Sequence, residues 1–247
     1  MPRFHAAWSV GSIVGAAVGI PMAAVHAPLP AHLGGLGLLA LAAVAACGRA
    51  FLAPTGVQES VTASRSAWRE PRTLAVGVMV LAFATVEGSA NDWLSLAIID
   101  GYDAPHWLGV LGFSVFVAAM TTGRLVGPLA LDRWGRAPVL WATSAVAVAG
   151  ILLVVLGGHP LLVTGGIVVW GLGASLGFPV GMSAAARVSV VSTIGYAAFL
   201  AGPPLLGQLG DRVGTLESLL AVAALMVPAG VTVAAVRPSR APAAVRG

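Results

Sequence analysis

The sequence predicts an all-α membrane protein with eight transmembrane helices. Of its 247 residues, 58% are hydrophobic and only 9% are charged, whereas a soluble domain carries about 25% charged residues. The apolar residues fall into eight runs of about 20 residues, the length that an α-helix needs to cross the hydrocarbon core of a bilayer. The lipid bilayer is therefore the first partner that the sequence predicts.

Polar segments between the apolar runs divide the chain. The predicted spans are 7–27, 33–53, 74–99, 107–131, 138–156, 161–184, 188–209 and 216–236. The longest polar segment, 54–73, is rich in Ser, Arg and Glu, as is typical of a linker. We therefore predict a helix pair over 1–53, a cytoplasmic linker over 54–73, a six-helix bundle over 74–236 and a cytoplasmic tail over 237–247.

The first run has two possible readings. Gly11, Gly15 and Gly19 recur at four-residue spacing, which is typical of a helix face that packs closely against another helix. The run could instead be a secretory signal peptide, with Arg3 in its charged N-terminal region. A second apolar run follows after a short proline turn, and this favours a pair of transmembrane helices.

The distribution of arginine predicts the topology. All 13 basic residues are arginine and the net charge is +4, but they lie in short gaps between apolar runs and form no basic face for nucleic acid. If both termini are cytoplasmic, Arg212 is the one arginine in an outside loop and Arg124 lies within a span. The other eleven are then at the inside, as the positive-inside rule expects: Arg3, Arg49, Arg65, Arg69, Arg72, Arg133, Arg136, Arg187, Arg237, Arg240 and Arg246. We predict a multi-pass protein of the plasma membrane.

The third predicted span carries Glu87, Asn91 and Asp92 in an otherwise apolar run. At about 1.5 Å per residue, Glu87 lies about 20 Å from either end of the span, where an acid costs roughly 2.5 to 3.5 kcal/mol to insert. Intramembrane acids mark functional sites by default, and Asn91 extends the polar face by one turn. We predict that these three residues serve proton coupling or line a substrate cavity. Alternatively, Glu87 is a hydrogen-bond partner between helices, and Asp92 is solvated near the outer end.

The end of the fourth predicted span carries a motif with several charged residues. It reads Gly123-Arg124-Leu125-Val126-Gly127-Pro128-Leu129-Ala130-Leu131-Asp132-Arg133-Trp134-Gly135-Arg136. This stretch resembles the motif of the major facilitator superfamily between the second and third helices of a six-helix half, a glycine followed by Asp-Arg-x-Gly-Arg. Gly127 lies five residues before Asp132, whereas the family spacing is four. The family spacing does occur at Gly207 and Asp211, which we interpret as a structural turn because it falls outside.

The resemblance implies a role for this loop. Glycine permits close helix approach, and the charged side chains form a latch that differs between inward-open and outward-open states. The predicted latch residues are Gly123, Arg124, Gly127, Asp132, Arg133, Gly135 and Arg136. Arg124 has alternatives, because it could pair with Asp132, pair with an acid elsewhere or contact substrate.

Two further stretches resemble the same family. The run from Glu87 to Trp93 is similar to the seventh helix of bacterial drug- and sugar-type facilitators, and the run from Gly195 to Gly207 is similar to the eleventh. The resemblance implies that 74–236 is the complete C-terminal half of a twelve-helix transporter. It also implies that 1–53 holds the last two helices of the N-terminal half, so that the first four helices are absent.

The sequence favours a secondary transporter that moves a small solute, coupled to a proton gradient. It has no phosphate-binding loop, no GxSxG and no HExxH, so neither an ATP-driven pump nor an enzyme is predicted. Its histidines lie at span ends without ligand spacing and Cys47 is its single cysteine, so no metal, cofactor or intramolecular disulfide is predicted. The alternatives are a truncated, non-transporting membrane remnant or interaction module and a polytopic enzyme without a recognised motif.

Overall fold

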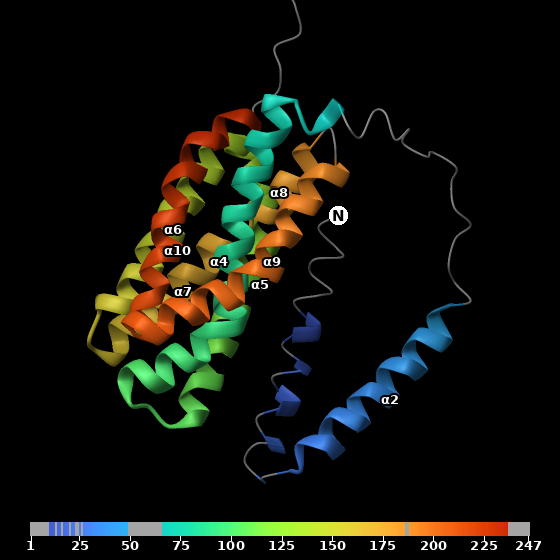
Figure 1. The fold of residues 1–247 in the computed structure, drawn as a ribbon, viewed down its shortest axis with the longest axis vertical. Helices are drawn as coiled ribbons and strands as arrows, with labels where there is room; N and C mark the ends of the chain where they lie inside the picture. Colours follow the sequence, from blue (N-terminus) through green and yellow to red (C-terminus); the bar gives the residue numbers. More distant parts are fainter. Residues whose placement is uncertain are drawn as a thin grey trace, which may run out of the picture.

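The computed structural model describes residues 10–48, apart from 13, 16, 20, 23, 24 and 26, together with residues 66–185 and 188–236. These residues form helices joined by short turns (Figure 1). The helices are α2 (Leu29–Cys47), α4 (Pro71–Tyr102), α5 (His106–Trp134), α6 (Arg136–Leu156), α7 (Pro160–Ala174), α8 (Gly177–Ala184), α9 (Val188–Val213), α10 (Thr215–Thr232) and the 3-10 helix η2 (Val233–Val236).

Seven helical stretches in the described residues are long and apolar enough to cross a membrane. The sixth predicted span is broken, because α7 and α8 share its length, and the eighth is α10 continued by η2. The first predicted run is described only in part, with a short helix over Val10–Gly19, so the count of eight stays a prediction. The predicted start of the second span, at residue 33, was too late: α2 begins at Leu29, because Pro30 fits the first turn of a helix. The predicted end of this span, residues 49–53, lies outside the described residues.

Helix α4 is the centre of the bundle. Its most apolar window is 72% buried, a larger share than in any other candidate span of the described residues. It packs against α5, α8, α9 and α10, which surround it in Figure 1. In contrast, no residue of α2 is buried. Glu87 of α4 is therefore placed where several helices meet.

Glycines allow the helices to approach closely. A methyl group at Gly150 of α6 would lie 2.2 Å from the backbone nitrogen of Trp170 in α7, and one at Gly177 of α8 would lie 1.9 Å from the ring of Phe83 in α4. Helices in a bilayer associate through this kind of packing, since lipid offers no hydrophobic drive between them.

Residues with positive φ end the helices at four turns. They are Asp103 (48°), Gly135 (79°), Gly158 (61°) and Gly214 (100°). Glycine takes this conformation without the steric cost that a Cβ brings, and aspartate is among the residues that tolerate it. The bundle therefore turns sharply between successive antiparallel helices.

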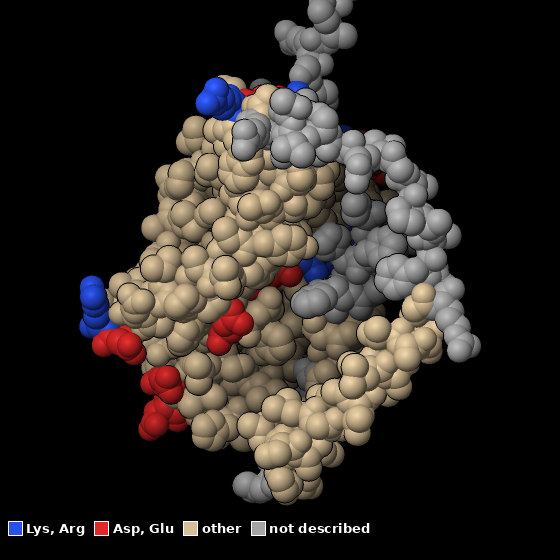
Figure 2. Space-filling view, turned by 45° about the vertical axis from the view of Figure 1, so that its right-hand side comes forward, with Lys and Arg blue, Asp and Glu red and all other residues tan. Residues whose placement is uncertain are grey.

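Charged residues gather at the two ends of the bundle, as Figure 2 shows. We call the end where α5 finishes and α6 begins the arginine end; it carries Arg69, Arg72, Arg133 and Arg136 with Glu70 and Asp132. The opposite end, where α4 finishes, we call the acidic end; it carries Asp100, Asp103, Asp211 and Glu217 with Arg212. This separation of charge agrees with the asymmetry on which the predicted topology rests.

Candidate functional site

A buried ion pair joins α4 to α5. Nη2 of Arg124 donates to both carboxylate oxygens of Glu87, at 2.8 Å each. Glu87 is 5% exposed and Arg124 is 6% exposed. This is the one ion pair within 4 Å among the described residues. The cation that pairs with Glu87 comes from the neighbouring helix α5. Of the alternatives for Arg124, the structure therefore shows pairing with an acid on another helix and not with Asp132.

The pair lies at the middle of the longest helix. Glu87 is 16 residues after Pro71 and 15 residues before Tyr102, the two ends of α4. Arg124 is 10 residues before Trp134, the end of α5. A glutamate at this depth would be costly alone, and its contact with a guanidinium stabilises the charged carboxylate.

The break between α7 and α8 supplies a third partner. Nε of Arg124 donates to the carbonyl oxygen of Ser175, at 3.3 Å. In a continuous helix this oxygen would accept from the backbone nitrogen four residues later, but that residue is Pro179, which has no N–H. Arg124 therefore satisfies a buried acceptor that the proline leaves without its helical donor.

Two predicted glycines bring α5 close to this break. A methyl group at Gly123 would lie 2.4 Å from Oγ of Ser175, and one at Gly127 would lie 2.4 Å from the side chain of Leu176. Both glycines belong to the predicted latch. In the structure they hold the backbone of α5 against the α7–α8 joint, which places Arg124 between that joint and α4.

The other two residues predicted in this span lie apart from the pair. Asn91 and Asp92 are exposed, while Glu87 is buried. The predicted polar face therefore changes from a covered to an open surface within one helical turn. Asn91 and Asp92 are thus exposed, whereas Glu87 contacts Arg124.

The site holds two opposite charges in the interior of the bundle. Removing water from two charges costs free energy. For a buried ion pair, this cost is offset only when the contact geometry is good and further hydrogen bonds form. Loss of either charge would leave the other side chain buried beside an uncharged group. A change in charge inside a packed bundle alters which helix packing is favourable. A local change can therefore shift the conformation of a larger part of the protein.

The chain resembles known bacterial membrane proteins over most of its length. An uncharacterized transporter of Sinorhizobium fredii is 30% identical to it, over 91% of this chain and 64% of the relative. An uncharacterized MFS-type transporter of Yersinia pestis is 30% identical over 85% of this chain and 57% of the relative. Both of these relatives are named as transporters, and the one from Yersinia pestis is named as an MFS-type transporter. No family model matches it.

Coverage of the relatives is incomplete. Membrane protein MosC of Rhizobium meliloti is 27% identical over 64% of this chain and 41% of that protein. The chain thus spans less than two thirds of the length of each of these three relatives.

The loop that resembles the motif of the superfamily forms the turn between α5 and α6. Gly135 has φ 79° and ends α5, which gives a physical reason for glycine at this position of the motif. The guanidinium carbon of Arg133 lies 5.6 Å from the centre of the Trp134 ring, a cation–π contact. Asp132 is exposed. Arg124 is thus separated from the loop and belongs to the buried site.

Sequence reasoning missed two members of the site, Ser175 and Pro179. Proline is tolerated within transmembrane helices, so Pro179 by itself does not predict a break. A signal was present, since a proline always deprives the residue four positions earlier of its helical donor. The sequence does not indicate that an arginine 51 residues away would replace that donor.

Proposed function

We propose that this chain acts in secondary transport of a small solute, and that the Glu87–Arg124 pair couples this transport to a proton gradient. The single observation that carries the proposal is the buried contact between these two residues at mid-helix. Its relatives are named as transporters. Intramembrane ion pairs typically mark ion or substrate pathways. We therefore assign the coupling of transport to the proton gradient to this pair.

In the proposed cycle, the pair is intact when Glu87 is unprotonated. Proton uptake by Glu87 weakens its attraction for Arg124, because a neutral carboxyl no longer balances the charge of the guanidinium, and Arg124 can then move away from Glu87. Arg124 also holds the carbonyl oxygen of Ser175. Movement of Arg124 would therefore change the support of the α7–α8 joint, a discontinuity of the kind that transporters place near their binding sites.

The remaining parts of the proposal follow the family. Helices α4 to α10 form the C-terminal half of the transporter, Asn91 and Asp92 face the solute cavity, and the loop from Asp132 to Arg136 acts as the latch. Both termini lie in the cytoplasm and the protein resides in the plasma membrane. The protein is proposed to transport and not to catalyse a covalent reaction.

Reconstitution tests the coupling. The 247-residue chain, and the longest form that its gene encodes, are placed in vesicles with an imposed pH gradient. The vesicles are offered a mixture of labelled sugars, amino acids and organic anions. We expect at least one solute to accumulate only with the gradient, and Glu87→Gln to abolish this accumulation while leaving folding intact. Exchange of that solute without a gradient should survive in the variant.

Two outcomes would contradict the proposal. Gradient-driven accumulation by Glu87→Gln at the unmodified rate would remove Glu87 from coupling. Failure of both wild-type forms to accumulate any solute of the mixture would favour the non-transporting alternative. Asp211→Asn serves as the matched control, because it neutralises an exposed acid on α9 away from the pair.

A further inference from the structure

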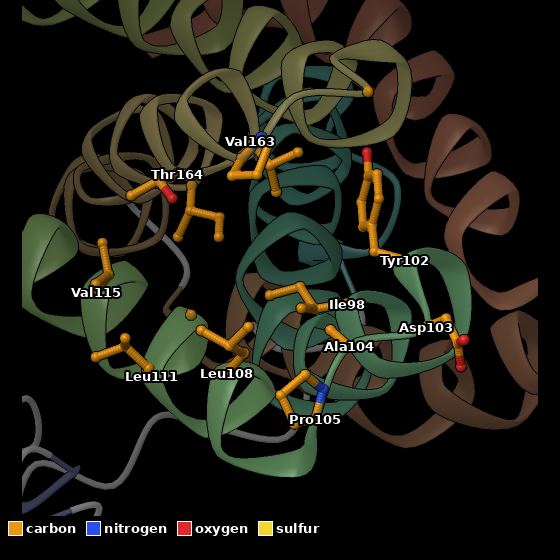
Figure 3. Close-up of a pocket in the computed structure, with 14 residues that line it drawn as sticks. Ile98, Tyr102, Asp103, Ala104, Pro105, Leu108, Leu111, Val115, Val163 and Thr164 are labelled. Atoms are coloured by element: carbon orange, nitrogen blue, oxygen red, sulfur yellow. The ribbon is translucent and has the colours of Figure 1, made fainter.

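A separate cavity opens at the acidic end of the bundle, with a volume of about 460 Å³. Figure 3 shows that its walls come from the end of α4, the start of α5 and the start of α7. Most of its lining is aliphatic, including Ile98, Leu108, Leu111, Val115 and Ile167. None of the residues of the Glu87–Arg124 site lines it. A cavity of this size and character is typical of a site for one drug-sized molecule.

One hydroxyl in this cavity is unused. Thr164 lines it from α7. Every other serine and threonine in the described residues has a hydrogen bond or another polar interaction, and most of them donate to a carbonyl of their own helix. Tyr102, in contrast, already donates its hydroxyl to the carbonyl of Val154. Thr164 therefore offers both a donor and an acceptor to a molecule in the cavity.

The charge at the edge of the cavity is negative. Asp103 belongs to the lining, lies at the rim in Figure 3 and is exposed. It has no ion-pair partner within 4 Å among the described residues. The surrounding acidic end adds three more acids against one arginine, so a cation is favoured over an anion at this mouth.

We propose that this cavity binds a small amphipathic amine: a compact apolar body packs between α4, α5 and α7, and its ammonium group lies at the mouth beside Asp103. The occupant is a free small molecule and not a phospholipid, because the volume suits one compact body and the negative rim would repel a lipid phosphate. This site is independent of the proposed coupling pair, and binding is measured without transport.

Calorimetry with rigid probes tests the proposal. The full chain in nanodiscs of zwitterionic lipid is titrated with 1-adamantylamine, 1-adamantanol and adamantane-1-carboxylate, and empty nanodiscs correct for partitioning. We expect the amine to bind more tightly than the alcohol and the carboxylate to bind most weakly. Equal affinity for the amine and the carboxylate would overturn the assignment of charge.

Three variants locate the site. Asp103→Asn should weaken the amine by about three- to fivefold, the scale of an exposed ion pair, without backbone strain, since asparagine also tolerates positive φ. The matched control, Asp100→Asn, removes an acid at the same end that does not line the cavity, and should leave binding unchanged. Val115→Phe fills the cavity and should abolish binding of all probes.

Several results would contradict the site. Full affinity for the amine in Val115→Phe would show that the amine binds elsewhere. Equal losses of affinity in Asp100→Asn and Asp103→Asn would show that the effect comes from the overall negative charge of this end and not from Asp103. A phospholipid that co-purifies with the wild-type chain and is lost in Val115→Phe, detected by mass spectrometry, would assign the cavity to lipid and overturn the proposal.

Discussion

Nη2 of Arg124 lies 2.8 Å from both carboxylate oxygens of Glu87, and this contact ties α5 to α4 at mid-helix. The same guanidinium donates through Nε to the carbonyl of Ser175 at the α7–α8 joint. One side chain therefore links three segments of the bundle. The charge of Glu87 determines whether the guanidinium of Arg124 faces an opposite charge on α4. The consequences for stability can be measured apart from transport.

Removal of the carboxylate should destabilise the bundle. Glu87→Leu leaves Arg124 buried without its anion, and breaking a buried pair in this way costs about 3 to 5 kcal/mol. Glu87→Gln should cost less, because an amide oxygen still accepts from the guanidinium. Unfolding in nanodiscs, followed by heat or denaturant, gives the two values.

The double variant Glu87→Leu with Arg124→Leu is the control for this prediction. It removes both charges, so it should recover much of the stability that Glu87→Leu loses. If the double variant is less stable than Glu87→Leu by the full loss in unfolding free energy that Arg124→Leu causes alone, the two effects are additive. Additivity would show that Glu87 and Arg124 do not stabilise each other.

The sequence indicated the members of the pair better than the pairing itself. Glu87 and Arg124 each stood out as a charge within an apolar run. Their contact depends on how α4 and α5 are rotated about their axes, and apolar runs without a polar face do not fix that rotation. The broken sixth span has a similar cause: its composition is apolar throughout, so only the packing against Arg124 and α4 shows where the helix stops.

Close packing of α6 on α7 gives a second prediction. A methyl group at Gly150 would lie within 3 Å of backbone atoms of Trp170 and Gly166, which cannot move aside as a flexible side chain can. Gly150→Ala should therefore destabilise the bundle by about 1 to 3 kcal/mol, as overpacking does. Gly165→Ala is the control, since nothing lies within 4 Å of its added methyl group. Thermal unfolding compares the two, and equal midpoints would show that α6 and α7 separate at little cost.

The proposed latch gives a third prediction. Asp132→Asn should leave insertion intact but shift the balance of inward-open and outward-open states by about 1 to 3 kcal/mol, the usual range of allosteric coupling. The measurement is the modification rate of a cysteine at the exposed Asn91, in a Cys47→Ser background, with an impermeant reagent added to either side of the vesicles. Asp211→Asn, in the similar motif at the acidic end, is the control. Unchanged rates from both sides would count against the latch.

The orientation of the bundle can be read from the two ends of α5. Trp107 and Trp134 are 62% and 61% exposed and lie at the acidic and arginine ends, so replacing either with cysteine alters no charge that directs insertion. Because arginine gathers at the end of Trp134, that end should face the cytoplasm. In a Cys47→Ser background, an impermeant maleimide added to intact cells should modify Trp107→Cys and spare Trp134→Cys, and permeabilised cells should show modification of both. The reverse pattern would invert the topology and place the amphipathic-amine cavity on the cytoplasmic side.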